Sequence, residues 1–266
     1  MRIPHPFRGE SPVLGLALSG GAIRGAAHIG VLQVLESAGI VPEIITGTSA
    51  GAIVGGTYAA GHRVEAIREV FREVRWPRLA HLSIREHLSL FSTAPFARLI
   101  ESLVGGRKFE DLGVRFVAVA CDILTGDRVV LDRGPVARAV TASSAVPGFF
   151  TPVVLGPRLL VDGGLVDNLP VQLARDMGAT FVLAVDVLSR PDGRLRPANP
   201  LDMLTHAAAI SSHSNHPDPK TVDCYVSPRV ADLSLVSFRD VKTLEERGRA
   251  AMEKALPALR AGLGTT

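Results

Sequence analysis

Cysteine is scarce in this sequence, which contains only Cys121 and Cys224 among 266 residues. Two thiols so far apart do not form a disulfide framework or a zinc site of clustered thiolates. Cys121 follows the apolar run that starts at Phe116, so we interpret it as a core residue rather than a nucleophile. The sequence predicts no metal site and no cofactor.

Aromatic residues and charge of one sign are also in short supply. Aromatic side chains make up 5% of the chain, and the formal net charge is only +3. A surface that stacks nucleobases needs aromatic side chains among basic ones, so we expect no nucleic-acid partner. The small positive excess favours approach to anionic lipid surfaces. The sequence carries no signature of an oligomeric state.

The sequence also lacks the patterns of a cleavable signal peptide and of a membrane span. The first ten residues contain no apolar segment before their charges resume. The uncharged stretch 44–61 is interrupted by glycines and threonines, which favours a buried strand, turn and helix. We therefore expect a cytoplasmic protein whose contact with the inner membrane face, if it makes any, is peripheral.

Apolar residues make up 47% of the chain, and strand-like and helix-like segments alternate along it. This alternation predicts a three-layer α/β/α fold around a mostly parallel sheet. We expect one domain over residues 1–266, with a core at about 13–188 and a loop and C-terminal packing segment at 189–266. The predicted strands are 13–18, 44–46, 114–120, 127–131, 159–161 and 181–187. The predicted helices are 26–38, 50–60, 64–74, 95–104, 136–142, 170–177 and 244–256.

One serine lies between two glycines where a predicted strand gives way to a predicted helix. The segment Gly47-Thr48-Ser49-Ala50-Gly51 has the layout of a nucleophile elbow, a sharp turn that projects the serine hydroxyl into a cleft. Glycine on each side allows a strained turn and close packing of the helix on its sheet. Ser49 is therefore a candidate nucleophile.

A glycine-rich turn, residues 19–25, follows the first predicted strand. Its N–H groups would lie at the positive end of a helix, where they can hold an anion such as the oxyanion of acyl transfer. Two alternatives stay open. Gly20, Ala22 and Gly25 lie at the spacing of a dinucleotide-binding loop, although the middle glycine and the acidic residue after the second strand are missing. The glycines could also serve packing alone.

The apolar run that ends at Asp162 is followed by Gly163 and Gly164. An aspartate at a strand end can accept the proton of a nucleophilic serine, provided that a dry cleft raises its pKa toward neutrality. An Asp-Gly turn without function is the simpler alternative. The sequence leaves open whether Asp167 or Asp186 influences Asp162.

In this order, these three segments resemble the patatin-like phospholipase family. Residues 18–35 resemble its glycine-rich block, residues 47–51 its serine elbow, and Asp162-Gly163-Gly164 its aspartate motif. Further similarity to short bacterial members lies at 108–112, 118–126 and 141–152. The resemblance covers nearly the whole chain.

The resemblance implies a serine acyl hydrolase, a lipase or phospholipase A-type esterase that uses a Ser-Asp dyad without histidine or metal. Ser49 would attack the ester of a lipid or other substrate, and Asp162 would act as base and then acid. Backbone N–H groups of Gly20, Gly21 and Ala22 would hold the oxyanion. The supporting residues would be Arg24, Gly47, Gly51 and Gly163. The alternative is a catalytically weak relative that binds acyl chains or a partner protein in the same cleft.

The chain departs from the family at one position, because many members carry three consecutive glycines where this chain has Gly20-Gly21-Ala22. Alanine keeps the N–H donor, but a positive φ there would cost about 1 kcal/mol or more. We interpret Arg24 as a loop-bracing or phosphate-facing charge, since a guanidinium does not exchange protons usefully.

Eight histidines raise the alternative of a Ser-His-Asp triad. We expect His28 to pack or cap locally on the helix after the glycine-rich turn. The cluster His206, His213 and His216 lacks the ligand spacing of a metal site, which favours a polar loop or lid.

Two further segments carry predictions about core packing and substrate binding. Residues 64–74 have apolar side chains at helical spacing, which predicts a core helix rather than a membrane-docking one. Residues 76–96 hold the only tryptophan and several leucines, and we predict a lid or acyl-binding cap there.

Overall fold

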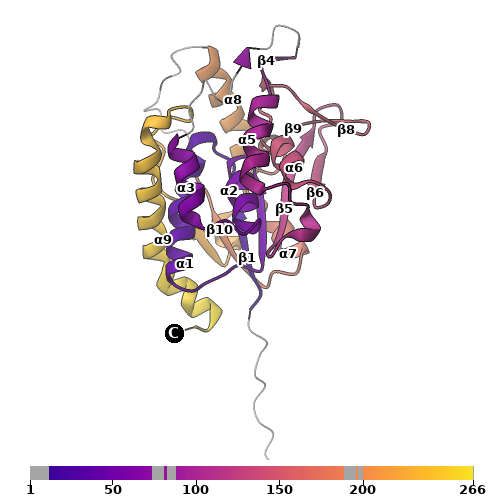
Figure 1. Ribbon diagram of the computed structural model, residues 1–266. Helices are drawn as coiled ribbons and strands as arrows, with labels where there is room; N and C mark the ends of the chain where they lie inside the picture. Colours follow the sequence, from indigo (N-terminus) through magenta and orange to yellow (C-terminus); the bar gives the residue numbers. More distant parts are fainter. Residues whose placement is uncertain (1–11, 74–80, 83–87, 189–195, 197–199, 266) are drawn as a thin grey trace, which may run out of the picture.

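The structure, a computed structural model, describes residues 12–73, 81–82, 88–188, 196 and 200–265. A central sheet is flanked by helices on both faces, so the predicted α/β class is confirmed (Figure 1). One face is covered by α1, α2, α5, α6 and α9, and the other by α7. Within these residues, no helix is both long and apolar enough to cross a membrane.

The central sheet has eight strands in the order β11-β10-β1-β2-β5-β9-β8, with β6 paired to β5. The first five of these run parallel, while β6, β8 and β9 are antiparallel to their neighbours. The sheet is therefore mostly parallel, as predicted. Its strands are β1 (Leu14–Leu18), β2 (Ile44–Thr48), β5 (Arg115–Asp122), β6 (Arg128–Leu131), β8 (Val153–Leu155), β9 (Arg158–Asp162), β10 (Phe181–Val185) and β11 (Cys224–Val226).

Strand β5 pairs with three neighbours but has only two edges. Its Ala118 and Ala120 face Leu131 and Val129 of β6, which therefore occupies one edge throughout this region. On the opposite edge, Val119 pairs with Thr48 at the end of β2, and the next residue, Ala120, pairs with Asp162 at the end of β9. Since β2 is parallel and β9 antiparallel to β5, the two strands meet end to end beside β5.

The helices follow the predicted ranges to within a few residues, with two exceptions. Residues 200–214 form a helix where a polar loop or lid was expected, and the C-terminal helix is longer at both ends than predicted. The helices are α1 (Ala26–Ser37), α2 (Ala50–Ala59), α3 (Val64–Glu73), α5 (Ala94–Val104), α6 (Val136–Ser143), α7 (Val171–Asp176), α8 (Pro200–Ser214) and α9 (Val241–Leu263). A second sheet of β3 (His81–Leu82), β4 (Ser89–Ser92) and β7 (Gly148–Phe150) was not predicted. That residues 1–266 form one domain stays a prediction.

Helix α9 lies directly against α1, as Figure 1 shows on the left of the molecule. The helices touch through two glycines, because a Cβ atom on Gly30 would overlap Glu245 O and one on Gly248 would overlap Ala27 O. Beside this contact, the buried carboxylate of Glu245 accepts a hydrogen bond from Arg72 of α3 at 2.9 Å. The C-terminal helix, which lies in the predicted C-terminal packing segment, is therefore closely packed against α1.

Replacement of Gly248 by alanine should destabilise the protein, because backbone lies where the new methyl group would go and neither helix can yield locally. We expect the free energy of unfolding to fall by about 2–4 kcal/mol, as in overpacked cores. Chemical denaturation measures the change. The matched control is Gly113→Ala, at a site with no atom within 4 Å of the added carbon. Equal stability of the two variants would contradict the close contact.

Candidate active site

Ser49 lies at the turn between β2 and α2, the place predicted for the nucleophile elbow. Its backbone has φ 53° and ψ −119°, a conformation that costs a non-glycine residue about 1–3 kcal/mol. Packing enforces it: a Cβ atom on Gly51 would overlap Leu18 O, and one on Gly47 would lie 2.7 Å from Gly51 O. Both glycines are thus required by close approach of α2 to the sheet, as the sequence suggested.

Asp162 lies directly opposite Ser49, at the end of β9. The Ser49 hydroxyl donates a hydrogen bond to Asp162 Oδ2 at 2.6 Å, and the Gly164 N–H donates to Oδ1 at 2.8 Å. The Ser49 and Asp162 residues are each 8% exposed. A Cβ atom on Gly163 would overlap Val119 O, so the turn after the aspartate must pass directly over β5.

Burial raises the pKa of Asp162 to about 6, although the hydrogen bonds from Ser49 and Gly164 oppose the shift. A carboxylate with this pKa is ionised at neutral pH and still basic enough to accept a proton from an attacking hydroxyl. The two other aspartates that the sequence left open have different partners. Asp167 pairs with Arg128 at 2.8 Å, and Asp186 pairs with His216 at 3.2 Å.

The glycine-rich turn between β1 and α1 borders the same site, but its amides are not equivalent. The Gly20 N–H donates to Asn168 O at 3.1 Å, so this amide is already bonded, contrary to its predicted role as an oxyanion donor. A Cβ atom on Gly20 would lie 2.5 Å from Asn168 Oδ1, so this glycine serves close packing instead. For the N–H groups of Gly21 and Ala22, the described part of the chain provides no hydrogen-bond acceptor.

Ala22 has φ 50°, the left-handed conformation that glycine adopts without cost. The departure from three glycines therefore carries the penalty named above, about 1 kcal/mol. Its N–H is kept, and both Ala22 and Ser49 line the same cavity. These two are the non-glycine residues with positive φ in the described chain.

Two further residues hold the site in place. The Arg24 guanidinium is buried and donates to the carbonyl oxygens of Leu233 and Ala231 at 2.7–3.0 Å, contacts that support the loop-bracing interpretation. The Ser49 N–H donates to Ser143 Oγ at 2.9 Å, so the C-terminal turn of α6 fixes the strained turn. The role of Ser143 was not predicted, because nothing in the sequence distinguishes it from its neighbour Ser144.

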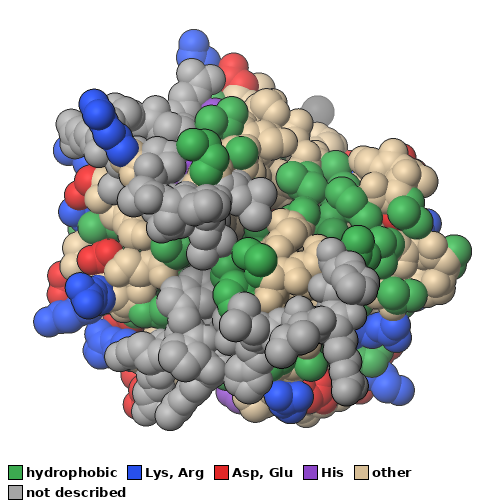
Figure 2. All heavy atoms as spheres, turned by 90° about the horizontal axis from the view of Figure 1, so that it is seen from above, with side chains coloured by type: hydrophobic (Ala, Val, Ile, Leu, Met, Phe, Trp, Pro, Cys, Tyr) green, Lys and Arg blue, Asp and Glu red, His purple; other side chains and the backbone are tan. Residues whose placement is uncertain are grey.

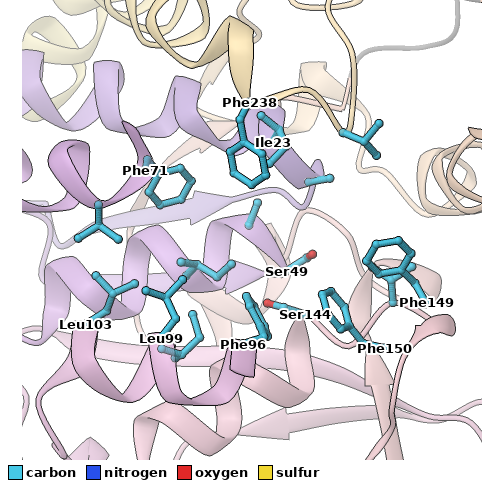
Figure 3. A pocket seen from close by; sticks show the side chains of 17 residues that line it. Ile23, Ser49, Phe71, Phe96, Leu99, Leu103, Ser144, Phe149, Phe150 and Phe238 are labelled. Carbon is cyan, nitrogen blue, oxygen red and sulfur yellow. The ribbon is translucent and has the colours of Figure 1, made fainter. Parts of the chain in front are cut away.

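A cavity of about 140 Å³ opens beside Ser49 and is almost entirely apolar (Figure 3). Its walls come from segments distant in sequence: α3, α5, the turn before β7 and the loop before α9. Helix α3, predicted to pack in the core, also presents Phe71 to this space, and α5 presents Phe96 from the end of the predicted cap. Residues 76–80 and 83–87 of that cap lie outside the described residues. The lining includes Ile23, Ile53, Val70, Phe71, Phe96, Leu99, Leu103, Phe149, Phe150 and Phe238.

A second, smaller space of about 70 Å³ also borders Ser49 and, in addition, Asp162. Its walls include Gly21, Asn168 and part of α8, and it is more polar than the larger cavity, with which it shares Ala22, Ser49 and Val146. Ser49 is therefore bordered by two spaces that differ in polarity.

None of the histidine side chains that the structure describes bonds to Ser49 or Asp162. His28 is fully buried with Nε2 2.9 Å from Ser19 O, which fits the predicted local role. His206 and His213 lie on α8, and His216 follows it. The described residues contain no group of three or more His, Cys, Asp or Glu side chains that could hold a metal. Both cysteines are buried free thiols.

The chain is similar in sequence to patatin-like phospholipases and to NTE family proteins. A family model described as patatin-like phospholipase matches residues 16–175. An uncharacterized NTE family protein of Mycobacterium tuberculosis is 32% identical over 92% of this chain and 46% of its own length. A lysophospholipase of Debaryomyces hansenii is 34% identical over 72% of this chain and 13% of its own. The chain thus spans about half the length of the mycobacterial relative and far less of the yeast protein.

Solved structures show the same fold at low sequence identity. VipD from Legionella pneumophila matches 95% of this chain and 67% of its own, with a TM-score of 0.57 and 13% identity. The type III effector protein ExoU matches 96% of this chain and 54% of its own, with a TM-score of 0.52 and 14% identity.

The buried His28 should make stability depend on pH. Burial lowers its pKa to about 4, against the hydrogen bond to Ser19 and the charge of Asp186. Between pH 6.5 and about 4 the unfolded chain binds a proton that the folded protein does not. This difference corresponds to a loss of about 3 kcal/mol of unfolding free energy as the pH falls.

Denaturation of wild type and His28→Gln at several pH values tests this expectation. The raised pKa of Asp162 acts in the opposite direction, but it is common to both proteins and cancels in their difference. We expect the stability of wild type to approach that of the variant as the pH decreases from 6.5 to 4. A constant difference across this window would contradict the assignment.

Proposed function

The chain belongs to the patatin-like phospholipase family, and on this premise we propose that it is a serine acyl hydrolase that cleaves carboxylic esters of lipids. The observation that carries the proposal is the 2.6 Å hydrogen bond from the Ser49 hydroxyl to Asp162 in a buried site that opens onto an apolar cavity. A nucleophile, a base within reach of its proton and a compartment for an acyl chain are the parts that such a reaction needs.

The proposed reaction starts with attack of Ser49 Oγ on the ester carbonyl carbon. Asp162 Oδ2 accepts the hydroxyl proton, the alcohol leaves with that proton, and an acyl-enzyme remains on Ser49. Water then attacks the acyl carbonyl carbon while Asp162 accepts its proton. The bond from that carbon to Ser49 Oγ breaks, the carboxylic acid leaves, and the proton returns to Ser49 Oγ. Because the Gly164 N–H bonds the other carboxylate oxygen, Oδ2 stays directed at the serine throughout.

The N–H groups of Gly21 and Ala22 are proposed to hold the oxyanion. They lie in the turn that borders both compartments beside Ser49, and a preorganised donor contributes about 3–4 kcal/mol to stabilisation of the transition state. Gly20 is left out of the donor set because its amide is bonded to Asn168 O. Gly47, Gly51, Gly163 and Arg24 are proposed to support this arrangement through the contacts described above.

The apolar lining of the larger cavity supports a lipid acyl group as the part of the substrate that it receives. The name of the yeast relative, a lysophospholipase, agrees with esters of this kind. The same cavity also suits the alternative of an acyl-binding protein without turnover. The strained Ala22 in the proposed oxyanion turn keeps that alternative in view.

The outer face above the site has a composition that suits lipid contact. Figure 2, which views the molecule from the carboxyl ends of the parallel strands, shows apolar side chains gathered there. Exposed members from elements at this end are Leu88, Leu90, Leu124, Val154 and Met203. We propose that this face approaches a lipid surface peripherally, so that ester substrates reach Ser49 without crossing much water.

A burst assay with p-nitrophenyl esters of increasing acyl length tests the function. Wild type should release one equivalent of p-nitrophenol rapidly, with kcat/KM rising with acyl length as the apolar cavity fills. Ser49→Ala should lose the burst, because no acyl-enzyme can form. Asp162→Asn should lower kcat by about 10²–10⁴, the usual contribution of a general base.

The control for folding is the thermal unfolding of each variant alongside wild type. Turnover by Ser49→Ala equal to that of wild type would refute the proposed nucleophile. Saturable binding of a fatty acid without turnover in folded wild type would favour the acyl-binding alternative.

The pH dependence of kcat/KM should report Asp162. Only the carboxylate can accept the serine proton, so activity should rise as the pH increases through about 6, the pKa that burial gives Asp162. This rise at acidic pH, the acid limb, is measured by the pH profile of kcat/KM for a short soluble ester. Residual activity of Asp162→Asn should lack it, and a midpoint near the ordinary aspartate value of about 4 would show that the base is not buried as described.

A further inference from the structure

A buried polar cluster joins three elements next to the proposed active site. The carboxylate of Asp186, directly after β10, accepts hydrogen bonds from Tyr225 of β11 at 2.6 Å and from the Leu188 N–H at 2.9 Å. His216 Nε2 lies 3.2 Å from the same carboxylate. Asp186 is 2% exposed, so this anion depends on protein donors rather than on water.

Both ring nitrogens of His216 face hydrogen-bond acceptors. Nδ1 lies 2.9 Å from Ser212 O in the last turn of α8, and Nε2 faces the Asp186 carboxylate. A neutral imidazole carries one N–H and can satisfy only one of these two oxygens. Both acceptors therefore receive a hydrogen bond only when the ring is an imidazolium. The charged ring then also donates to the Ser212 carbonyl at the negative, C-terminal end of α8.

The helix held in this way forms part of the smaller compartment beside Ser49. Ala208, Ala209 and Ser212 of α8 line that space together with Asp162 and Asn168. A second contact lies next to the histidine, where Asn215 Nδ2 donates to Leu165 O at 2.8 Å. The end of α8 is thus fixed both to β10 and to the turn that follows the aspartate.

We propose that His216 is a positioning residue, whose imidazolium ties the end of α8 to Asp186 and thereby holds the wall of the compartment that receives the alcohol portion of the ester. The inference rests on the proposed function, since it concerns the leaving-group side of the same site. It assigns His216 no direct contact with the reacting atoms.

Several charged groups act on His216 from the elements around it. Burial alone would lower its pKa, but the hydrogen bond and charge of Asp186, the Ser212 carbonyl and the charge of Asp167 together raise it above the ordinary value. Asp186 has a pKa of about 2, because the bonds from His216, Tyr225 and Leu188 outweigh its burial. His213 stacks on the His216 ring at 4.8 Å, Arg128 pairs with Asp167, and the buried His28 faces the charge of Asp186.

The contact between His216 and Asp186 should weaken as the pH rises. We call the bonds from the His216 imidazolium to Asp186 and Ser212 the tether. Because the pKa of His216 is raised, the tether is complete below the ordinary histidine pKa of about 6.5 and is lost as the pH rises through the raised pKa. Since Asp162 must be ionised for activity, the two groups predict a bell-shaped profile of kcat/KM: an acid limb from Asp162 and a basic limb from His216.

The first experiment compares pH profiles for a short soluble ester in wild type, His216→Gln and Asp186→Asn. We expect kcat/KM of wild type to fall about five- to fiftyfold through the basic limb, as a displaced wall disturbs the reacting geometry. His216→Gln should lack this limb and show the lower value at all pH values above the acid limb. Asp186→Asn should move the limb to lower pH. Ser211→Ala, on the exposed side of α8, is the matched control and should retain the wild-type profile.

Hydrogen exchange of wild type provides a readout that needs neither variant nor activity. After correction for the intrinsic effect of pH, amides at 207–214 should lose protection as His216 deprotonates, while amides of α1 should not. Loss of protection in protein without esterase activity would refute the proposed function and leave the tether standing. Unchanged protection, together with a basic limb that persists in His216→Gln, would overturn the tether.

Discussion

The register of β5 is the constraint on which the rest of the site depends. One edge of this strand holds β2 and β9 end to end, with Thr48 and Asp162 paired to consecutive residues of β5. A shift of either strand by one residue would move its side chains by about 3.3 Å and turn them to the other face of the sheet. The 2.6 Å hydrogen bond between Ser49 and Asp162 is therefore a consequence of backbone pairing, and not of side-chain flexibility.

The buried carboxylates of Asp162 and Asp186 accept hydrogen bonds from two separate sets of donors. Asp162, at the end of β9, accepts from Ser49 and Gly164, whereas Asp186, directly after β10, accepts from His216, Tyr225 and Leu188. The donors of Asp162 are neutral, and burial dominates its pKa. The donors of Asp186 include an imidazole, and they dominate instead. Two aspartates at strand ends thus acquire opposite acid–base properties from their partners.

The sequence predicted the parts of the molecule whose signals are local. The fold class, the turn at Ser49 and the candidate Asp162 all followed from short motifs between apolar segments. The sequence did not reveal that the Gly20 amide is bonded to Asn168 O, that Ser143 supports Ser49, or that Phe71 of α3 lines the cavity. Each of these depends on contacts between segments far apart in the chain, which neither periodicity nor turn chemistry encodes. Helix α8 was missed because its serines and histidines lower its helical propensity, while contacts such as that of His216 with Asp186 hold it in place.

During synthesis, Ser49 and Asp162 can come together only after β2 and β9 have both paired with β5. Ser49 and Asp162 are 113 residues apart, and the strand that aligns them lies between them in the chain. Pairing of such distant segments comes late in folding because loop closure must precede it. A nascent chain that has exposed Ser49 on a ribosome still lacks both β5 and Asp162. The hydrogen bond between the Ser49 hydroxyl and the Asp162 carboxylate therefore cannot form until β9 emerges and pairs with β5.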